Sequence, residues 1–165
     1  MKHRISRRCL AASAAGALGS LGIAFSANEA RAQTKTRSFH ADLTSDEQPK
    51  VTISPGTGTL DVNVDVATLR MTYRVASQNL TSRVTGIHLH GPCWKGDLAP
   101  AILDLAPRGI ATPLQGSLTV TEGQLQYMLN GELYLNITTA KYPEGEIRGQ
   151  FQRRPDRPMD HFGPT

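Results

Sequence analysis

Between residues 38 and 152, short stretches of the chain have hydrophobic residues at every second position. Leu60, Val62 and Val64 alternate with polar residues, and the stretch from Leu69 to Val75 repeats this spacing. Alternation puts the hydrophobic side chains on one face and the polar ones on the other, which is typical of antiparallel strands with one buried face. Further stretches that predict strands are 38–43, 83–90, 101–105, 116–120, 132–139 and 146–152.

About eight short strands separated by Gly, Pro, Asn and Asp predict an all-β fold, either an antiparallel two-sheet sandwich or a flattened barrel. One segment departs from the alternation. Thr121 and Gln124 have the spacing of a capping box, and Leu125, Met128 and Leu129 share one helical face. We therefore expect one short helix over 121–129, closed by Asn130-Gly131.

The first 32 residues have the composition of an export signal. Basic residues precede a weakly apolar run from Cys9 to Phe25, and Ala30-Arg31-Ala32 offers the small residues that a signal peptidase recognises. The run is too weakly apolar to predict a permanent membrane anchor. Ser6-Arg7-Arg8-Cys9-Leu10 resembles a twin-arginine signal, and the alternative is a general secretory signal with a chance arginine pair.

These features predict a signal peptide over 1–32, an N-terminal extension over 33–37, one β domain over 38–152 and a flexible tail over 153–165. We expect the mature protein outside the cytoplasm, in the periplasm or secreted. Cleavage also removes Cys9, so Cys93 would be the only cysteine left in an oxidising compartment, without a partner for an internal disulfide.

Removal of the signal changes the charge of the protein. Five of the 18 basic residues and one of the 14 acidic residues lie in the first 32 positions, so the mature chain holds 13 of each and has no net charge. The short basic cluster at Arg153, Arg154 and Arg157 is interrupted by proline and aspartate. A neutral domain of this kind does not favour nucleic acid as a partner. The sequence leaves open which protein or surface is the partner, and the oligomeric state.

Three stretches, taken together and in order, carry a resemblance to a known family. They are Gly86-Ile87-His88-Leu89-His90-Gly91-Pro92, the run from Leu129 to Thr139, and Pro143-Glu144-Gly145-Glu146-Ile147-Arg148-Gly149-Gln150. In this order the chain resembles the CHRD (chordin-type) domain over about residues 38–151. The resemblance implies a β-sandwich module of secreted proteins, used in animal chordins within a growth-factor antagonist. It implies no defined biochemical role for bacterial members.

His88 and His90 are candidate metal ligands. They stand two residues apart on a predicted strand, so both imidazoles face away from the core that Ile87 and Leu89 enter. The stretch is similar to the copper-binding strand of copper/zinc superoxide dismutases, and imidazole ligands suit copper or zinc. Two histidines do not complete such a site, and the mature chain lacks the further ligands of a dismutase, so we do not expect that activity.

Cys93 is the candidate third ligand, because it follows His90 by three residues in a loop that also holds Trp94. Many CHRD members carry another histidine where this chain has Thr138. Two interpretations stay open: His88, His90 and Cys93 hold copper or zinc, or the histidines are hydrogen-bonded to the neighbouring strand and the thiol is tolerated.

No catalytic residues are proposed, because the sequence offers neither a nucleophile with its base nor a phosphate-binding loop. Glu146 and Arg148 lie two apart and are expected to form an ion pair. The sequence thus favours an exported binding or structural module, with the His88/His90 strand and the 91–96 loop as its functional surface. The alternative is an extracytoplasmic protein that binds copper or zinc through His88 and His90.

Overall fold

The computed structural model describes residues 35–107, 110 and 112–155 of the chain, which lie in one compact unit. The predicted signal peptide, most of the N-terminal extension and most of the C-terminal tail lie outside these residues. The strands are β1 (Thr36–Thr44), β2 (Thr57–Asp65), β3 (Arg70–Gln78), β4 (Val84–His90), β5 (Ala101–Asp104), β6 (Leu114–Thr119), β7 (Tyr134–Thr139), β8 (Ile147–Gln150) and β9 (Gln152–Arg153).

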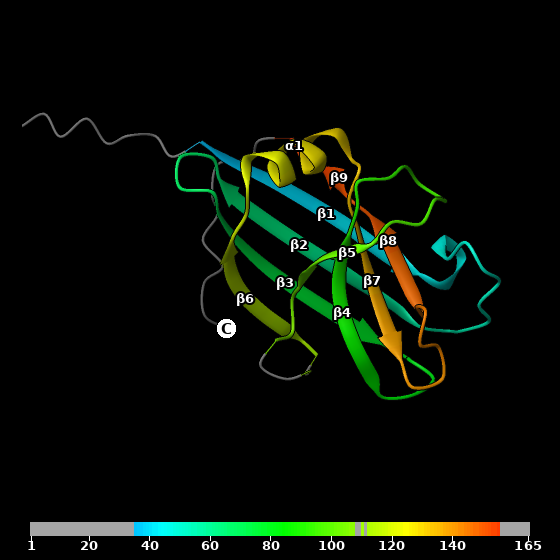
Figure 1. Cartoon of the computed structure of the whole chain (residues 1–165). Coiled ribbons are helices and arrows are strands. Elements are labelled where there is room, and N and C mark those ends of the chain that lie inside the picture. Colours follow the sequence, from blue (N-terminus) through cyan, green and yellow to red (C-terminus); the bar gives the residue numbers. More distant parts are fainter. Residues whose placement is uncertain (1–34, 108–109, 111, 156–165) are drawn as a thin grey trace, which may run out of the picture. The chain divides into compact units, whose positions relative to one another are not determined.

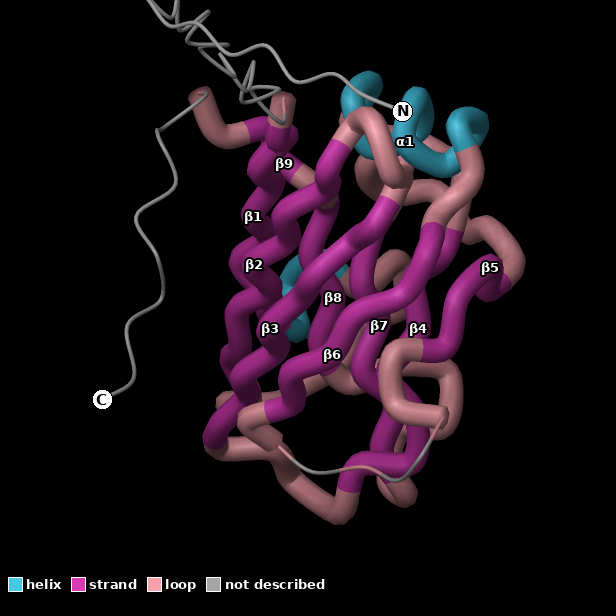
Figure 2. Tube along the Cα trace, turned by 90° about the vertical axis from the view of Figure 1, so that its left-hand side faces the viewer, coloured by secondary structure: helices cyan, strands magenta, loops and turns pink. Residues whose placement is uncertain are grey.

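All these strands belong to one antiparallel sheet in the order β5-β4-β7-β8-β1-β2-β3-β6, and β9 also pairs with β1. The sheet curls so that β3 and β6 come to face the side formed by β4 and β7 (Figures 1 and 2). The hydroxyl of Tyr73 on β3 donates to the carbonyl of Leu105, just after β5, across 2.7 Å. The all-β prediction is confirmed, as a single curled sheet that resembles an opened, flattened barrel.

The alternation read from the sequence sets the two faces of this sheet. Leu60, Val62 and Val64 on β2 are at most 1% exposed, as are Ile87 and Leu89 on β4. Their side chains meet inside the curled sheet, where apolar burial supplies the main favourable term for folding. The polar residues between them are left on the outer face.

The single α-helix of the described residues closes an end of the curled sheet (Figure 1). Helix α1 (Glu122–Asn130) begins with the predicted capping box, in which Thr121 Oγ1 accepts from the Gln124 amide. Gly131 ends it in the left-handed conformation (φ 72°), which glycine adopts without strain. Leu125 and Met128 are buried against the core. Among the described residues, no helix is long and apolar enough to span a membrane.

The expected ion pair between Glu146 and Arg148 is wrong. Glu146 is fully buried, and its carboxylate accepts from Ser54 Oγ (2.6 Å), the Thr81 amide (2.7 Å) and Thr139 Oγ1 (2.6 Å). Burial alone would raise the pKa of this carboxyl, but these hydrogen bonds outweigh it and hold the pKa below its usual range. Glu146 therefore connects the end of β7 with the loops that hold Ser54 and Thr81. It forms no ion pair with Arg148.

Candidate functional site

The outer face of β4, β7 and β8 is covered, unlike the solvated outer face of β2 and β3. Tyr134 and Asn136 on β7 are 2% and 6% exposed, and Arg148 on β8 is 1% exposed, although all three lie opposite the apolar core. Two loops supply the cover, the 91–100 loop after β4 and the 48–54 loop after the short 3-10 helix η1 (Ser45–Glu47). The chain thus has a second buried layer, and this one is polar.

Three side chains of this layer stack across three neighbouring strands. The rings of His90 and Tyr134 are nearly parallel, with centroids 4.9 Å apart and an interplanar angle of 16°. The guanidinium carbon of Arg148 lies 3.6 Å from the Tyr134 ring centroid. Because β7 lies between β4 and β8, the tyrosine ring is sandwiched between the imidazole and the guanidinium. The stack fixes the orientation of His90 from behind.

Arg148 is short of hydrogen-bond partners for a buried cation. Its Nη2 donates to Gln150 Oε1 at 3.4 Å, while Nε and Nη1 are buried without a partner among the described residues. No described carboxylate lies within ion-pairing distance of it. Burying a charge without an oppositely charged partner lowers the stability of the folded state, so Arg148 is expected to contribute little to stability.

His90 is held in one tautomer by the covering loop. Its Nδ1 lies 2.9 Å from the carbonyl oxygen of Ala99, which can only accept, so Nδ1 carries the hydrogen. Desolvation by burial lowers the pKa of His90 and outweighs the opposing effect of the Ala99 hydrogen bond, and His88 and Arg148 each add a smaller lowering effect. His90 is therefore neutral near pH 7, and its Nε2 is left as an acceptor that makes no hydrogen bond within the described part of the chain.

A groove of about 540 Å³ opens above this layer. The half-buried His90 and the buried Tyr134 and Asn136 contribute to its floor, and its other lining comes from residues 48–52, Leu98 and Ala99, and residues 141–145. Asn136 is fixed by hydrogen bonds from Gln48 Nε2 (2.9 Å) and to the Glu144 carbonyl (2.9 Å). The floor is therefore rigid and polar.

The groove carries exposed apolar side chains at its rim, beside the charged Lys50 and Glu144. Val51 is 95% exposed and Leu98 is 69% exposed, and both line the groove. Trp94, 62% exposed, lies in the same loop as Leu98 and lines a second cavity of about 490 Å³ beside it. Exposed apolar side chains gathered around a concavity are typical of binding surfaces.

His88 shares the outer face with His90, as predicted. The two rings are 6.3 Å apart between centroids and perpendicular. The ring of His88 occupies the space above Gly86: a Cβ on that glycine would lie 2.5 Å from His88 Cε1 and 2.8 Å from Thr138 Oγ1. Gly86 is thus required for this position of the ring, and it brings His88 beside Thr138.

Cys93 does not join the two histidines. It lines the second cavity, whereas His90 lines the groove, and its Sγ lies 3.5 Å from the Asp97 carbonyl. Burial raises the pKa of the thiol, although the nearby Arg148 acts in the opposite direction. No group of three His, Cys, Asp or Glu side chains able to hold one metal ion is found among the described residues. Metal binding by His88, His90 and Cys93 stays a prediction.

Sequence reasoning missed three residues of this site: Tyr134, Asn136 and Arg148. A signal for the first two was present, because they alternate with Leu135 and Ile137 on a strand that pairs with the histidine strand, His90 opposite Tyr134 and His88 opposite Asn136. No sequence pattern predicts that the 91–100 and 48–54 loops cover this face, because their positions depend on tertiary contacts.

Comparison with known proteins agrees with this geometry. The family model of the CHRD domain matches residues 39–151, so this chain belongs to the CHRD domain family. The match includes the histidine strand, β7 and β8, and thus the whole polar layer. No curated protein and no solved structure matches the chain.

Proposed function

We propose that this protein is an exported CHRD binding module whose ligand lies in the groove above His90, Tyr134 and Asn136. The observation that carries the proposal is the combination of a rigid polar floor with the exposed apolar side chains of Val51 and Leu98 at the rim. Covering exposed apolar side chains with a partner makes the free energy of binding more favourable, and fixed polar groups below them give selectivity. Export is inferred from the first 32 residues, and a CHRD domain is consistent with an extracellular location.

Two paired substitutions test the groove as the binding surface. Leu98→Asp places a charge on the apolar rim, and Thr72→Asp places the same charge on the outer face of β3, away from the groove. Mature protein immobilised through its C-terminus is exposed to the extracytoplasmic fraction of its host. We expect one species to be retained by the parent and by Thr72→Asp and lost with Leu98→Asp. Equal retention by all three proteins, or none by the parent, contradicts the proposal.

Metal binding is the second candidate, and the tautomer of His90 favours it. Histidine ligands commonly donate one ring N–H to a carbonyl and offer the other nitrogen to the metal, which is the arrangement of His90 Nδ1 with Ala99. His88 could be the second ligand, and copper or zinc the metal. A third ligand would have to come from Cys93 after a loop movement, or from a partner.

Calorimetric titration of the mature protein with Zn²⁺ or Cu²⁺ separates the two candidates. A metal site predicts one equivalent bound, lost in both His88→Gln and His90→Gln, and weakened in Cys93→Ser if the thiol takes part. His40→Gln, on a distant strand of the sheet, is the control and should bind as the parent does. Uptake that is unchanged in all the variants would eliminate this site.

A further inference from the structure

The curled sheet has two margins, β5 and β6, and they differ in how well they exclude a further strand. β5 is four residues long, its register with β4 is irregular, and it ends at Asp104. Short length, irregular register and charge are means by which natural sheets block the addition of a strand. β6 is six residues long, its register with β3 is unbroken, and none of its side chains is charged. The margin at β6 is therefore the unprotected one.

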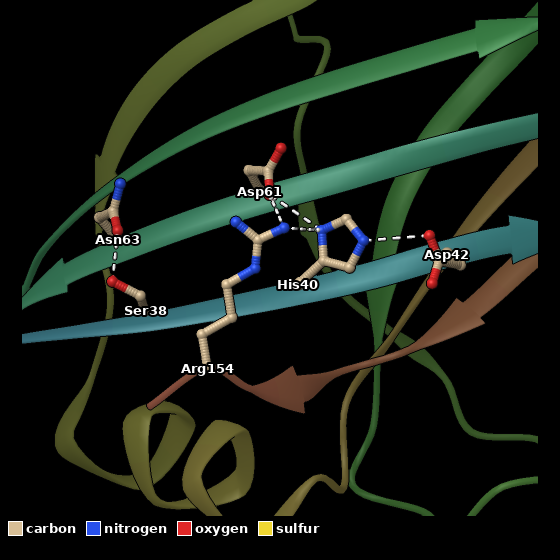
Figure 3. A network of polar contacts seen from close by, with 6 residues as sticks. All are labelled: Ser38, His40, Asp42, Asp61, Asn63 and Arg154. Carbon is tan, nitrogen blue, oxygen red and sulfur yellow. Dashed lines mark hydrogen bonds and ion pairs between the residues drawn. The ribbon is translucent and has the colours of Figure 1, made fainter. Parts of the chain in front are cut away.

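The lack of charge on β6 contrasts with the centre of the sheet. The outer face of β1 and β2 carries a network of His40, Asp61 and Arg154, in which the guanidinium lies 3.1 Å from Asp61 Oδ1 (Figure 3). These two strands already have neighbours on both sides. Charge is thus present where no further strand can pair, and absent from the margin where it would repel one.

The free side of β6 is open to solvent. Leu114 and Leu118 pack against the core but stay partly exposed, whereas their register partners on β3, Val75 and Met71, are fully buried. Among the described residues, no strand pairs with β6 on this side, and no backbone hydrogen bond outside the pairing with β3 involves it. An added strand would cover both leucines and supply partners for the free N–H and C=O groups.

We propose that β6 is a dimerisation edge, at which a second copy of this chain adds its own β6 in the antiparallel direction. A twofold axis at Gly116 sets the register and makes the two sheets continuous. On the core face, Leu114 lies opposite Leu118 of the second copy. On the outer face, Gln115 lies opposite Ser117 of the second copy. Apolar residues therefore meet apolar ones, and uncharged polar residues meet each other.

The charges of the protein permit this pairing. The predicted mature chain has no net charge, so two copies do not repel each other as a whole. Arg70 and Arg74 on β3 are separated from those of the second copy by three strand spacings, about 14 Å. None of the residues that line the groove belongs to β6, so the dimer edge is separate from the proposed ligand site. A pair of six-residue strands by itself buries less than the about 1,200 Å² of a standard interface, so the dimer should be weak.

Sedimentation equilibrium of the mature protein, from about 5 to about 500 µM, tests for a weak dimer of this kind. We expect the average mass to rise from that of one chain toward that of two. Hydrogen exchange locates the contact in the same samples. The amides of residues 114–119 should exchange about twofold or more slowly at the highest concentration, because less monomer is present, while those of β4 should not change.

Two double variants test the register, and they differ only in the sign of one charge. Gln115→Glu with Ser117→Glu puts carboxylates opposite each other across the axis, and should weaken association by about tenfold or more. Within one chain the new carboxylates lie beside Arg74, in register with Gln115, and Arg70, which donates to Ser117 Oγ, so the fold should be kept. Gln115→Glu with Ser117→Lys pairs opposite charges across the axis and should associate at least as tightly as the parent.

Gln126→Glu with Gln78→Glu adds the same charge as the first variant away from β6, and should associate as the parent does. Circular dichroism confirms that each variant is folded. The proposal is overturned if the parent stays a monomer over the whole range, or if its residues 114–119 exchange equally fast at both ends of the range. It is equally overturned if Gln115→Glu with Ser117→Glu dimerises like the parent, or if both variants at these positions are weakened alike.

Discussion

The guanidinium of Arg148 lies 3.6 Å from the ring centroid of Tyr134, and it is the largest fully buried side chain in the described part of the chain. This contact joins β8 to β7 on the face of the sheet that is opposite the hydrophobic core. On the other side of the ring, His90 stacks at 4.9 Å. The buried guanidinium and the Tyr134 ring together support the imidazole of His90 at the floor of the groove.

Arg148 should contribute more to the geometry of the site than to stability. Arg148→Met keeps most of the volume and removes the unpartnered N–H groups, so its free energy of unfolding should be within about 1 kcal/mol of the parent, or higher. Arg148→Ala also loses packing and the contact with Tyr134, and should cost about 2 to 4 kcal/mol. Urea unfolding of the three proteins gives both numbers. Equal large losses in both variants would mean that the guanidinium stabilises the fold through its own bonds.

Glu146 should be required for stability. In Glu146→Gln, the side-chain NH₂ group replaces a carboxylate oxygen that accepts hydrogen bonds, so a donor faces the donors of Ser54, Thr81 or Thr139. We expect a loss of about 2 to 4 kcal/mol in the free energy of unfolding. Glu144→Gln, which removes only an exposed ion pair with Lys50, is the control and should cost under about 1 kcal/mol. A loss no larger than that of the control would show that the three hydrogen bonds to Glu146 contribute little.

The lowered pKa of Glu146 also predicts a pH dependence. The unfolded carboxyl binds its proton more readily than the folded one, so the stabilisation is complete above the unfolded pKa, near 4.5, and is lost as pH falls through the lower folded pKa. The difference in unfolding free energy between the parent and Glu146→Gln should therefore shrink in acid. A difference that stays constant from pH 7 to pH 3 would contradict this assignment.

Thr138 stands where a third imidazole would reach His88. Thr138 Oγ1 and His88 Cε1 both lie within 3 Å of the position of a Cβ on Gly86. Thr138→His should therefore raise the affinity for Zn²⁺ by about tenfold or more, equivalent to about 1.4 kcal/mol, as measured by calorimetry. The double variant with His88→Gln should lose that gain. An unchanged affinity in Thr138→His would show that the outer face of β4 cannot assemble a three-histidine site.

The sequence predicted the fold closely because the alternation reports directly which face of each strand is buried. The core residues on β2, β3 and β4 follow from it, as do the capping box at Thr121 and the end of α1 at Gly131. The polar layer could not be predicted in the same way. Arg148 occupies a position that the pattern marks as outward and solvated, and it is buried only through tertiary contacts of β8, among them those with η1 and with the loop that holds Cys93.

The Arg7-Arg8 pair carries the prediction about the export route. If the pair is a twin-arginine signal, Arg7→Lys with Arg8→Lys should leave the full-length precursor in the cytoplasm, while the parent is recovered outside it with Gln33 as its first residue. Cell fractionation with intact-mass analysis distinguishes these forms. Normal export of the double variant would assign the protein to the general secretory route, and a mature protein that retains residues 1–32 would contradict cleavage.

The groove is tested most directly by photo-crosslinking in the living host. A photoreactive amino acid at Val51, on the exposed rim, is compared with the same residue at Thr72, on the outer face of β3. The proposed binding module predicts a covalent adduct of one defined mass from position 51, none from position 72, and loss of the adduct when Leu98→Asp is added. Adducts that form equally at both positions, or at neither, would contradict a binding role for this groove.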